Sequence, residues 1–102
     1  MPEFGSPFSG MKAERKLTKA ELIRALRFMV AAEYEAVQLY MQLAESTDEE
    51  VAKDVLVDIA DEERVHAGEF LRLLGHLAPD EDKFYKEGEE EVNEIIEKLK
   101  GK

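Results

Sequence analysis

The sequence lacks cysteine altogether and has only two histidines among its 102 residues. Without thiols, it excludes disulfide scaffolds, zinc ribbons, rubredoxin centres and enzymes that use a cysteine nucleophile. Positive charge is scarce as well, because 24 acidic residues outnumber 14 basic ones and leave a net charge of −10. Phosphate neutralisation needs a surplus of Lys and Arg, so the composition argues against nucleic acid as a partner and favours cations.

Long hydrophobic runs are also missing. No apolar stretch approaches the roughly 18 residues of a membrane-spanning helix, so we expect no membrane partner. No basic start with an apolar core follows Met1, so we expect no secretory signal. Two of the three prolines fall in residues 1–10, MPEFGSPFSG, which have no periodicity. We interpret these residues as a disordered leader or expression scar and assign the single folded domain to residues 11–102.

What the sequence does contain is helical periodicity. Thr18 and Glu21 have the spacing of a capping box, and Leu17 and Leu22 occupy the positions of a hydrophobic staple. These signals predict a helix that runs to about Glu45. Its apolar row repeats in alternating steps of four and three residues. The members of this row are Leu22, Leu26, Met29, Glu33, Ala36, Tyr40 and Leu43.

A second helix is predicted to start near Asp48. Thr47 and Glu50 offer another capping box, and Gly75 is a predicted stop because a residue just past a helix often needs a left-handed backbone. Its row also alternates steps of four and three residues. The members are Ala52, Leu56, Ile59, Glu63, His66, Phe70, Leu73 and Leu77.

A third segment, residues 80–99, is helical in character, but Gly88 and the acidic run after it weaken it, so we expect a broken or mobile C-terminal helix. Two long helices joined by a short turn form an antiparallel hairpin, which has no closed core of its own. The expected fold is therefore all-α. A two-helix hairpin plus a short C-terminal helix dimerises into a ferritin-like four-helix bundle.

Three charged residues interrupt the two apolar rows. Carboxylates at such positions are costly unless they are paired or bind a metal. Glu63 and His66 form a Glu-x-x-His motif, whose side chains lie on one helix face and reach one ion. Glu33 lies nearly as far before the turn at Thr47 as Glu63 lies after it, so we expect their carboxylates to converge.

One chain offers too few ligands for a di-metal centre. Two chains together give four glutamates and two histidines, which is the ligand set of di-iron and di-manganese bundles. This donor set suits Fe, with Mn as the other possibility, and places the site on the dimer axis. His76 does not belong to a second motif, because Leu73 precedes it by three residues.

Further residues near the rows have two interpretations each. Tyr40, one heptad after Glu33, is either a hydrogen-bond partner of a ligand carboxylate or an ordinary core tyrosine. Glu35 faces away from Glu33, on a second partly apolar row that suggests a further interface. That row also contains Phe28, Ala32 and Leu39. The acidic residues beside the second helix form either an approach for cations or a solvated face, and they are Asp58, Glu62 and Glu69.

These residues resemble the encapsulated ferritins, which are ferritin-like proteins carried inside encapsulin shells. The matching stretches are AAEYEAVQLY (31–40) and DIADEERVHAGEFLRLL (58–74), with the short turn ESTDEE between them. The combination of Glu-x-Glu-Ala-x-x-x-Tyr with Glu-Glu-x-x-His carries the resemblance, which covers roughly residues 18–80. Rubrerythrins share pieces of this pattern, but they carry two Glu-x-x-His-type halves in one chain.

The resemblance implies a ferroxidase that uses dioxygen to oxidise Fe(II) at a di-iron site shared between two chains. It implies dimers assembled into a decameric ring, which supply iron storage inside an encapsulin nanocompartment in the cytoplasm. Glu33, Glu63 and His66 match the metal ligands, Tyr40 matches the tyrosine near them, and Glu35 matches an outer cation site. Ala32 replaces a carboxylate of that outer site, which weakens it.

The resemblance leaves the shell connection and the reaction with alternatives. The C-terminal EIIEKLKGK does not resemble a shell-targeting peptide, so the native chain is either longer and fused to its shell or targeted by another segment. The alternative functions are peroxide detoxification, as in rubrerythrins and manganese catalases, and a purely structural dimerisation module.

Overall fold

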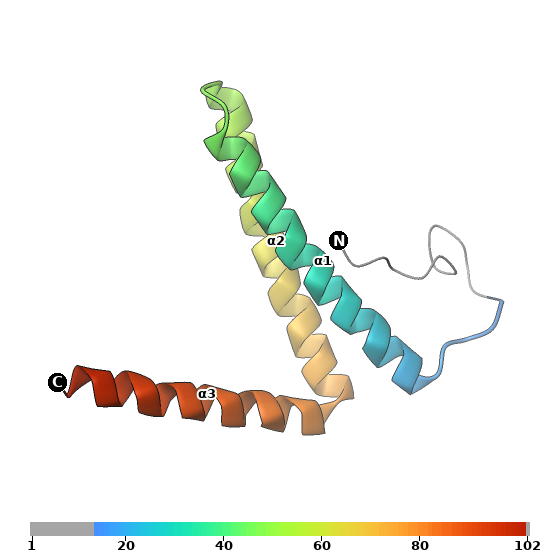
Figure 1. Ribbon diagram of the computed structural model, residues 1–102. Coiled ribbons are helices and arrows are strands. Elements are labelled where there is room, and N and C mark those ends of the chain that lie inside the picture. The colour runs from blue at the N-terminus through green and yellow to red at the C-terminus, as the bar shows by residue number, and fades with distance from the viewer. Residues whose placement is uncertain (1–13, 102) are drawn as a thin grey trace.

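The computed structural model describes residues 14–101, so the predicted leader lies outside the described part of the chain. The structure contains α1 (Lys19–Glu45), α2 (Glu50–Leu77) and α3 (Pro79–Lys100). Helices α1 and α2 run antiparallel side by side, and α3 projects from the end of α2 at a steep angle (Figure 1). The all-α prediction is confirmed. Within residues 14–101, no helix is both long and apolar enough to cross a membrane.

The start of α1 is fixed as predicted. The Thr18 hydroxyl accepts a hydrogen bond from the Glu21 backbone N–H at 3.2 Å, and the Glu21 carboxylate accepts one from the Thr18 N–H at 2.8 Å. The Arg15 guanidinium donates two further hydrogen bonds to the same carboxylate. Arg15 and then the Thr18 backbone stabilise the charged form and lower the pKa of Glu21 to about 2.

The start of α2 differs from the prediction. The Thr47–Glu50 capping box is wrong, because the Thr47 hydroxyl accepts its hydrogen bond from the Glu49 N–H, at 3.2 Å, inside the turn. The Glu49 carboxylate caps α2 instead, and accepts from the backbone N–H groups of Val51 and Ala52 at 3.4 and 2.6 Å. A carboxylate at a helix N-terminus also interacts favourably with the helix dipole.

The end of α2 is set by Pro79 rather than by Gly75, so the predicted stop is wrong. Proline disfavours a helical conformation in the preceding residue, and Ala78 has φ −131° and ψ 69°. The helix therefore continues to Leu77, and Pro79 opens α3 at the position where its missing N–H costs least.

Helix α3 is continuous through Gly88, so the predicted break is wrong, whereas the predicted extent of residues 80–99 agrees with the observed helix to within one residue at each end. Charged side chains at both ends of α3 interact favourably with the helix dipole and stabilise the helix. The acidic residues of the first turn are Asp80, Glu81 and Asp82, and the basic residues of the last turn are Lys98 and Lys100. Ion pairs one turn apart, such as Lys86 with Asp82 at 3.3 Å, give the isolated helix further support.

The buried core lies between α1 and α2 and is small. Its residues are Leu26, Val30 and Ala44 from α1, and Ala60, Ala67 and Leu74 from α2. The described part of α3 has no buried residue. Leu26 of the first predicted row is part of this core, and the rest of the predicted rows lie beside it on one side of the hairpin, which we call the open face. Large apolar side chains on the open face are 38% to 53% exposed, namely Leu22, Met29, Leu43 and Leu73.

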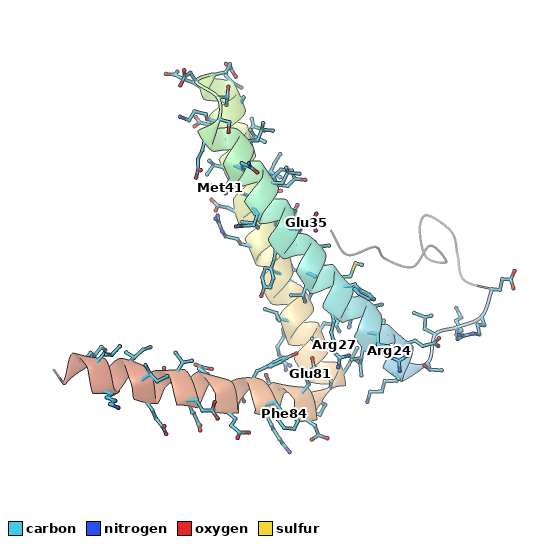
Figure 2. The ribbon with its side chains drawn as sticks, in the orientation of Figure 1. Arg24, Arg27, Glu35, Met41, Glu81 and Phe84 are labelled. Atoms are coloured by element: carbon cyan, nitrogen blue, oxygen red, sulfur yellow. The ribbon has the colours of Figure 1, made fainter. Side chains whose placement is uncertain are left out.

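One polar network joins α1 to α3. The Arg27 Nε donates to both carboxylate oxygens of Glu81, at 3.1 and 3.3 Å, and Arg27 Nη2 and the Tyr85 hydroxyl donate to the same carboxylate. Figure 2 shows Arg27 and Glu81 together where α1 passes the start of α3. The Arg27 guanidinium, followed by the Tyr85 hydroxyl, lowers the pKa of Glu81, and the carboxylate in turn raises the pKa of Tyr85.

Candidate metal centre

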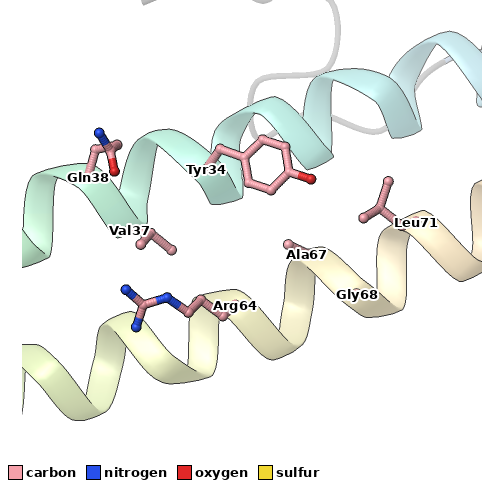
Figure 3. Close-up of a pocket in the computed structure, with 7 residues that line it drawn as sticks. All are labelled: Tyr34, Val37, Gln38, Arg64, Ala67, Gly68 and Leu71. Atoms are coloured by element: carbon pink, nitrogen blue, oxygen red, sulfur yellow. The ribbon is translucent and has the colours of Figure 1, made fainter. Parts of the chain in front are cut away.

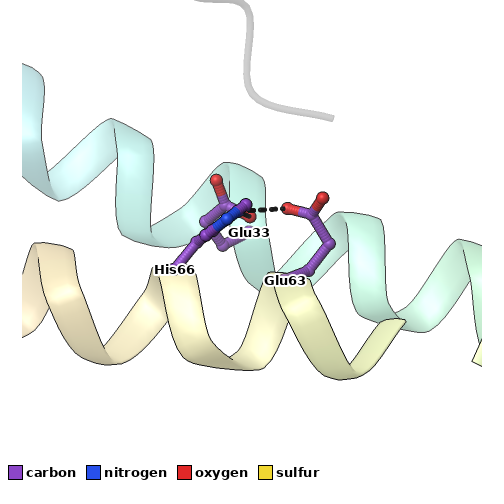
Figure 4. Close-up of side chains that lie close together, drawn as sticks. All are labelled: Glu33, Glu63 and His66. Carbon is purple, nitrogen blue, oxygen red and sulfur yellow. Dashed lines mark ion pairs between the residues drawn. The ribbon is translucent and has the colours of Figure 1, made fainter. Parts of the chain in front are cut away.

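The three charged residues of the apolar rows meet at one place on the hairpin. Helix α1 supplies Glu33, and α2 supplies Glu63 and His66 (Figure 4). One ligand atom from each residue lies within 4.8 Å of the others. The His66 Nδ1 is 3.5 Å from Glu63 Oε2 and 3.8 Å from Glu33 Oε2. The convergence predicted from the height of each residue above the turn is therefore found in the structure.

Packing of the hairpin explains this convergence. On α2, the buried alanines Ala60 and Ala67 allow a close approach to α1, and Glu63 lies between them at the edge of the core. On α1, Glu33 follows the buried Val30 by three residues, so it lies one turn further along and on the open-face side. His66 follows Glu63 by three residues and therefore shares its side of α2.

The two carboxylates are more enclosed than the imidazole. The side chains of Glu33 and Glu63 are 17% and 19% exposed, whereas His66 is 48% exposed. Within the described residues, Glu33 Oε2 is buried and has no hydrogen-bond partner. A buried, unpartnered carboxylate oxygen is costly, and a bound cation would satisfy it. The carboxylate and imidazole donors suit Fe or Mn, so these three residues fit a divalent ion.

A shallow depression opens beside His66. Its lining residues are Glu33, His66, Glu69 and Phe70, and we call it the His66 depression. The sequence placed Phe70 only in the apolar row and left Glu69 between an approach for cations and a solvated face. The structure puts both residues at the open side of the cluster.

The other two predicted site residues lie outside the three-residue cluster. Tyr40 is half-buried, seven residues beyond Glu33 along α1, and it forms no hydrogen bond with Glu33 or Glu63 in the described structure. Glu35 is partly exposed on the side of α1 turned away from α2 (Figure 2). Neither position assigns a role, so both roles stay predictions.

A second hollow lies on the opposite side of the hairpin from the open face. Its lining residues are Tyr34, Val37, Gln38, Arg64, Ala67, Gly68 and Leu71 (Figure 3). Arg64 directly follows Glu63, but the helix turns it to this other side, where its guanidinium pairs with Asp61. The metal-ligand cluster therefore has no arginine from this hollow competing for its carboxylates.

Comparison with known proteins identifies the family to which this fold belongs. A family model described as Rubrerythrin matches residues 24–100. The crystal structure of an encapsulated ferritin domain from Pyrococcus furiosus superposes with a TM-score of 0.80 and 35% identity, and the match covers 91% of this chain and 93% of that one.

Two longer relatives are also described as proteins associated with encapsulins. An encapsulin nanocompartment cargo protein from Myxococcus xanthus is 38% identical over 90 residues, which are 88% of this chain and 68% of that protein. A ferritin-like–encapsulin shell fusion protein from Pyrococcus furiosus is 40% identical over 82 residues, or 80% of this chain. The matched part spans only 24% of the fusion protein. The chain therefore belongs to the rubrerythrin family of ferritin-like proteins and, within it, to the encapsulated ferritins.

Proposed function

We propose that this protein is a ferroxidase that oxidises Fe(II) at a di-iron site shared by two copies of the chain. The observation that carries the proposal is the convergence of Glu33, Glu63 and His66, with one ligand atom from each within 4.8 Å of the others. The buried and unpartnered Glu33 Oε2 supports it, because a divalent cation would satisfy that oxygen.

The ligand count requires the second copy. One cluster supplies two carboxylates and one imidazole, and a pair of copies supplies twice that set. The clusters lie beside the open face, where large apolar side chains remain exposed. Joining two open faces buries these side chains and brings the two clusters together in one four-helix bundle.

In the proposed dimer, Glu63 of both copies would be shared by the two iron substrates, and Glu33 and His66 of each copy would hold one iron. Two ions held side by side in this way would deliver their electrons to one dioxygen. Two Fe(II) release two electrons, which reduce one dioxygen with two protons to hydrogen peroxide. The Fe(III) product then leaves for mineralisation. The resemblance to encapsulated ferritins further assigns Tyr40 as a hydrogen-bond partner of a ligand carboxylate once the dimer forms, and Glu35 as part of an outer cation site.

Storage of the oxidised iron requires a larger container. A helical hairpin encloses no volume for a mineral, whereas the relatives are described as an encapsulin cargo protein and an encapsulin shell fusion. We therefore place the chain inside an encapsulin nanocompartment in the cytoplasm, with the shell protein as its partner. The resemblance to encapsulated ferritins adds the proposal that five dimers form a decameric ring.

Anaerobic titration with Fe(II) tests the centre directly. Two irons per dimer predict saturation near one iron per chain. Replacing Glu63 with Ala should abolish this saturation, because it removes both bridging carboxylates of the dimer. The matched control is Glu62→Ala, which removes an exposed carboxylate from the next position on α2. Unchanged saturation in Glu63→Ala would contradict the proposal.

Peroxide reduction at the same centre is a second candidate, favoured by the match to the rubrerythrin family model. A single preparation loaded with Fe(II) should be mixed with dioxygen in one experiment and with hydrogen peroxide in another. The ferroxidase proposal predicts rapid Fe(III) formation with dioxygen. Oxidation that proceeds only with peroxide would favour the second candidate.

A further inference from the structure

Small residues flank Glu63 in the row of α2 that packs against α1. This row contains Ala60, Glu63 and Ala67 in steps of three and four residues, and the next buried member is Leu74. Ala60 and Ala67 are 0% and 5% exposed, and the Glu63 side chain between them is 19% exposed. Because the side chains at a contact set the distance between two packed helices, these alanines favour a close approach on either side of Glu63.

Ala60 is the more tightly enclosed of the two alanines. None of its surface is exposed, and it lines neither the His66 depression nor the hollow on the opposite side of the hairpin. Ala67, by contrast, borders that hollow together with Tyr34 of α1 (Figure 3). A larger side chain at position 67 could turn into the hollow. At position 60, a larger side chain fits only if α1 and α2 move apart, because the interior is close-packed.

The candidate ligands depend on the spacing of the helices because they come from both. Glu33 belongs to α1, and its Oε2 lies 3.8 Å from the Nδ1 of His66 on α2. Glu63 and His66 lie one turn apart on the same helix, so their separation does not depend on α1. Metal–ligand distances tolerate deviations of only about 0.2 Å. A small separation of the helices therefore withdraws Glu33 from the cluster and leaves the other two ligands together.

We propose that Ala60 is a positioning residue for the metal centre, because its methyl group sets the helix spacing at which Glu33 reaches the two ligands on α2. This inference rests on the proposed ferroxidase function. It concerns the interior of one hairpin, so it does not depend on which surfaces a second copy covers. Ala60 offers no ligand atom itself. Its enlargement therefore weakens the affinity for a divalent ion while every ligand remains in the chain.

Titration with Mn(II), followed by the electron paramagnetic resonance signal of the free ion, tests this role in Ala60→Leu. We expect the affinity to fall roughly tenfold or more, because a ligand displaced by about 1 Å no longer fits its site. Ala60→Ser, whose side chain is nearly as small as that of alanine, should keep the affinity. The matched control is Ala44→Leu, since Ala44 is also buried but lies about three helical turns beyond Glu33, at the end of α1.

The outcomes separate this inference from the function on which it rests. If Ala60→Leu does not fold, Ala60→Val makes the same test with a smaller side chain. Unchanged affinity in the folded variant, or an equal loss in Ala44→Leu or Ala60→Ser, would overturn the role of Ala60 and leave the ferroxidase proposal intact. Mn(II) binding without oxidation of Fe(II) would instead remove the ferroxidase and keep the role of Ala60. If the unmodified protein binds neither ion, both proposals fail.

Discussion

At the scale of single residues, Glu33 is a carboxylate at a position where packing would favour an apolar side chain. Glu33 lies one turn beyond the buried Val30, and one of its carboxylate oxygens is buried without a hydrogen-bond partner, with only the His66 Nδ1 at 3.8 Å. A leucine at position 33 would pack there without a desolvated polar atom. We therefore expect the carboxylate to lower the stability of the metal-free chain, and the proposed metal binding gives a reason for its presence.

Replacing Glu33 with Leu should therefore have opposite effects without and with metal. In the metal-free protein we expect a gain in unfolding free energy of about 1–3 kcal/mol, because the unpartnered oxygen is removed. With Mn(II) present, the unmodified protein should be stabilised by ion binding and the variant should not.

Thermal unfolding with and without Mn(II) measures both effects. Glu45→Leu is the control, because Glu45 is an exposed carboxylate at the end of α1, away from the cluster, and the variant should keep the metal-induced gain. A Glu33→Leu protein that is destabilised without metal, or still stabilised by it, would argue against a metal-binding role for Glu33.

The convergence of the three candidate ligands was predictable because helix geometry is regular. Glu33, Glu63 and His66 share the open-face side of two antiparallel helices, and their heights follow from counting residues from one turn. The burial of Glu33 Oε2 and the position of Glu69 at an opening were not predictable. Both depend on how neighbouring side chains fill space, which residue spacing does not specify.

At the scale of elements, helix interiors were predicted better than helix ends. The Thr18 capping box depends on residues three apart and was correct. At the start of α2, by contrast, Thr47 and Glu49 can both accept hydrogen bonds from backbone N–H groups. The Thr47 hydroxyl accepts one inside the turn, and the Glu49 carboxylate caps the helix. Pro79 outweighed Gly75 because a proline constrains its neighbour sterically, whereas a glycine merely permits a helix to end.

The direction of α3 depends on few contacts. With no buried residue in its described part, α3 is held near its start by Glu81, which binds Arg27 of α1 and Tyr85 of its own next turn. The Glu81 side chain is 17% exposed, so this network is partly protected from solvent. We expect it to fix the angle between α3 and the hairpin.

Replacing Arg27 with Ala should let α3 move. Spin labels on two introduced cysteines, one in α1 and one near the end of α3, report their distance without interference because the chain has no cysteine of its own. The distance distribution should broaden in Arg27→Ala. It should stay narrow in Arg24→Ala, since Arg24 lies one turn earlier on α1 and has no ion pair in the described structure. Equal distributions would show that the Ala78–Pro79 junction alone sets the angle.

Acid should mimic that variant. The pKa of Glu81 is lowered in the folded chain. Its pairing therefore stabilises the folded structure fully at pH values above the pKa of Glu in the unfolded chain, which is about 4.3. The stabilisation is lost as the pH falls through the lower folded value. The spin-label distribution of the unmodified protein should therefore broaden below about pH 4.

At the scale of the whole molecule, the hairpin leaves an apolar face uncovered. The hairpin encloses few side chains, whereas the open face exposes Leu22, Met29, Leu43 and Leu73 beside the ligand cluster. Two copies that join these faces hide apolar surface but also bring together two chains of charge −10. Charge repulsion therefore opposes an association that apolar burial favours.

Divalent ions should reduce the charge repulsion between the two copies at the ligand clusters, where the carboxylates of both chains would face each other. Each ion neutralises two charges between the facing clusters and supplies a partner for the buried Glu33 oxygen. We therefore expect Mn(II) to shift the mass in solution from the monomer toward the dimer, or to larger assemblies of dimers, in analytical ultracentrifugation. A chelator should reverse the shift. Added monovalent salt should also favour the dimer, but less, because it screens repulsion without bridging the two copies.

The two histidines provide the matched pair for this experiment. His66→Ala removes a ligand, so Mn(II) should no longer change its mass distribution. His76→Ala removes the other imidazole, which lies in the last turn of α2 away from the cluster, and should respond as the unmodified protein does. If both variants respond equally, the metal acts on the acidic surface at large. A dimer that forms fully without metal and ignores a chelator would instead mean that apolar burial alone outweighs the repulsion between the two copies.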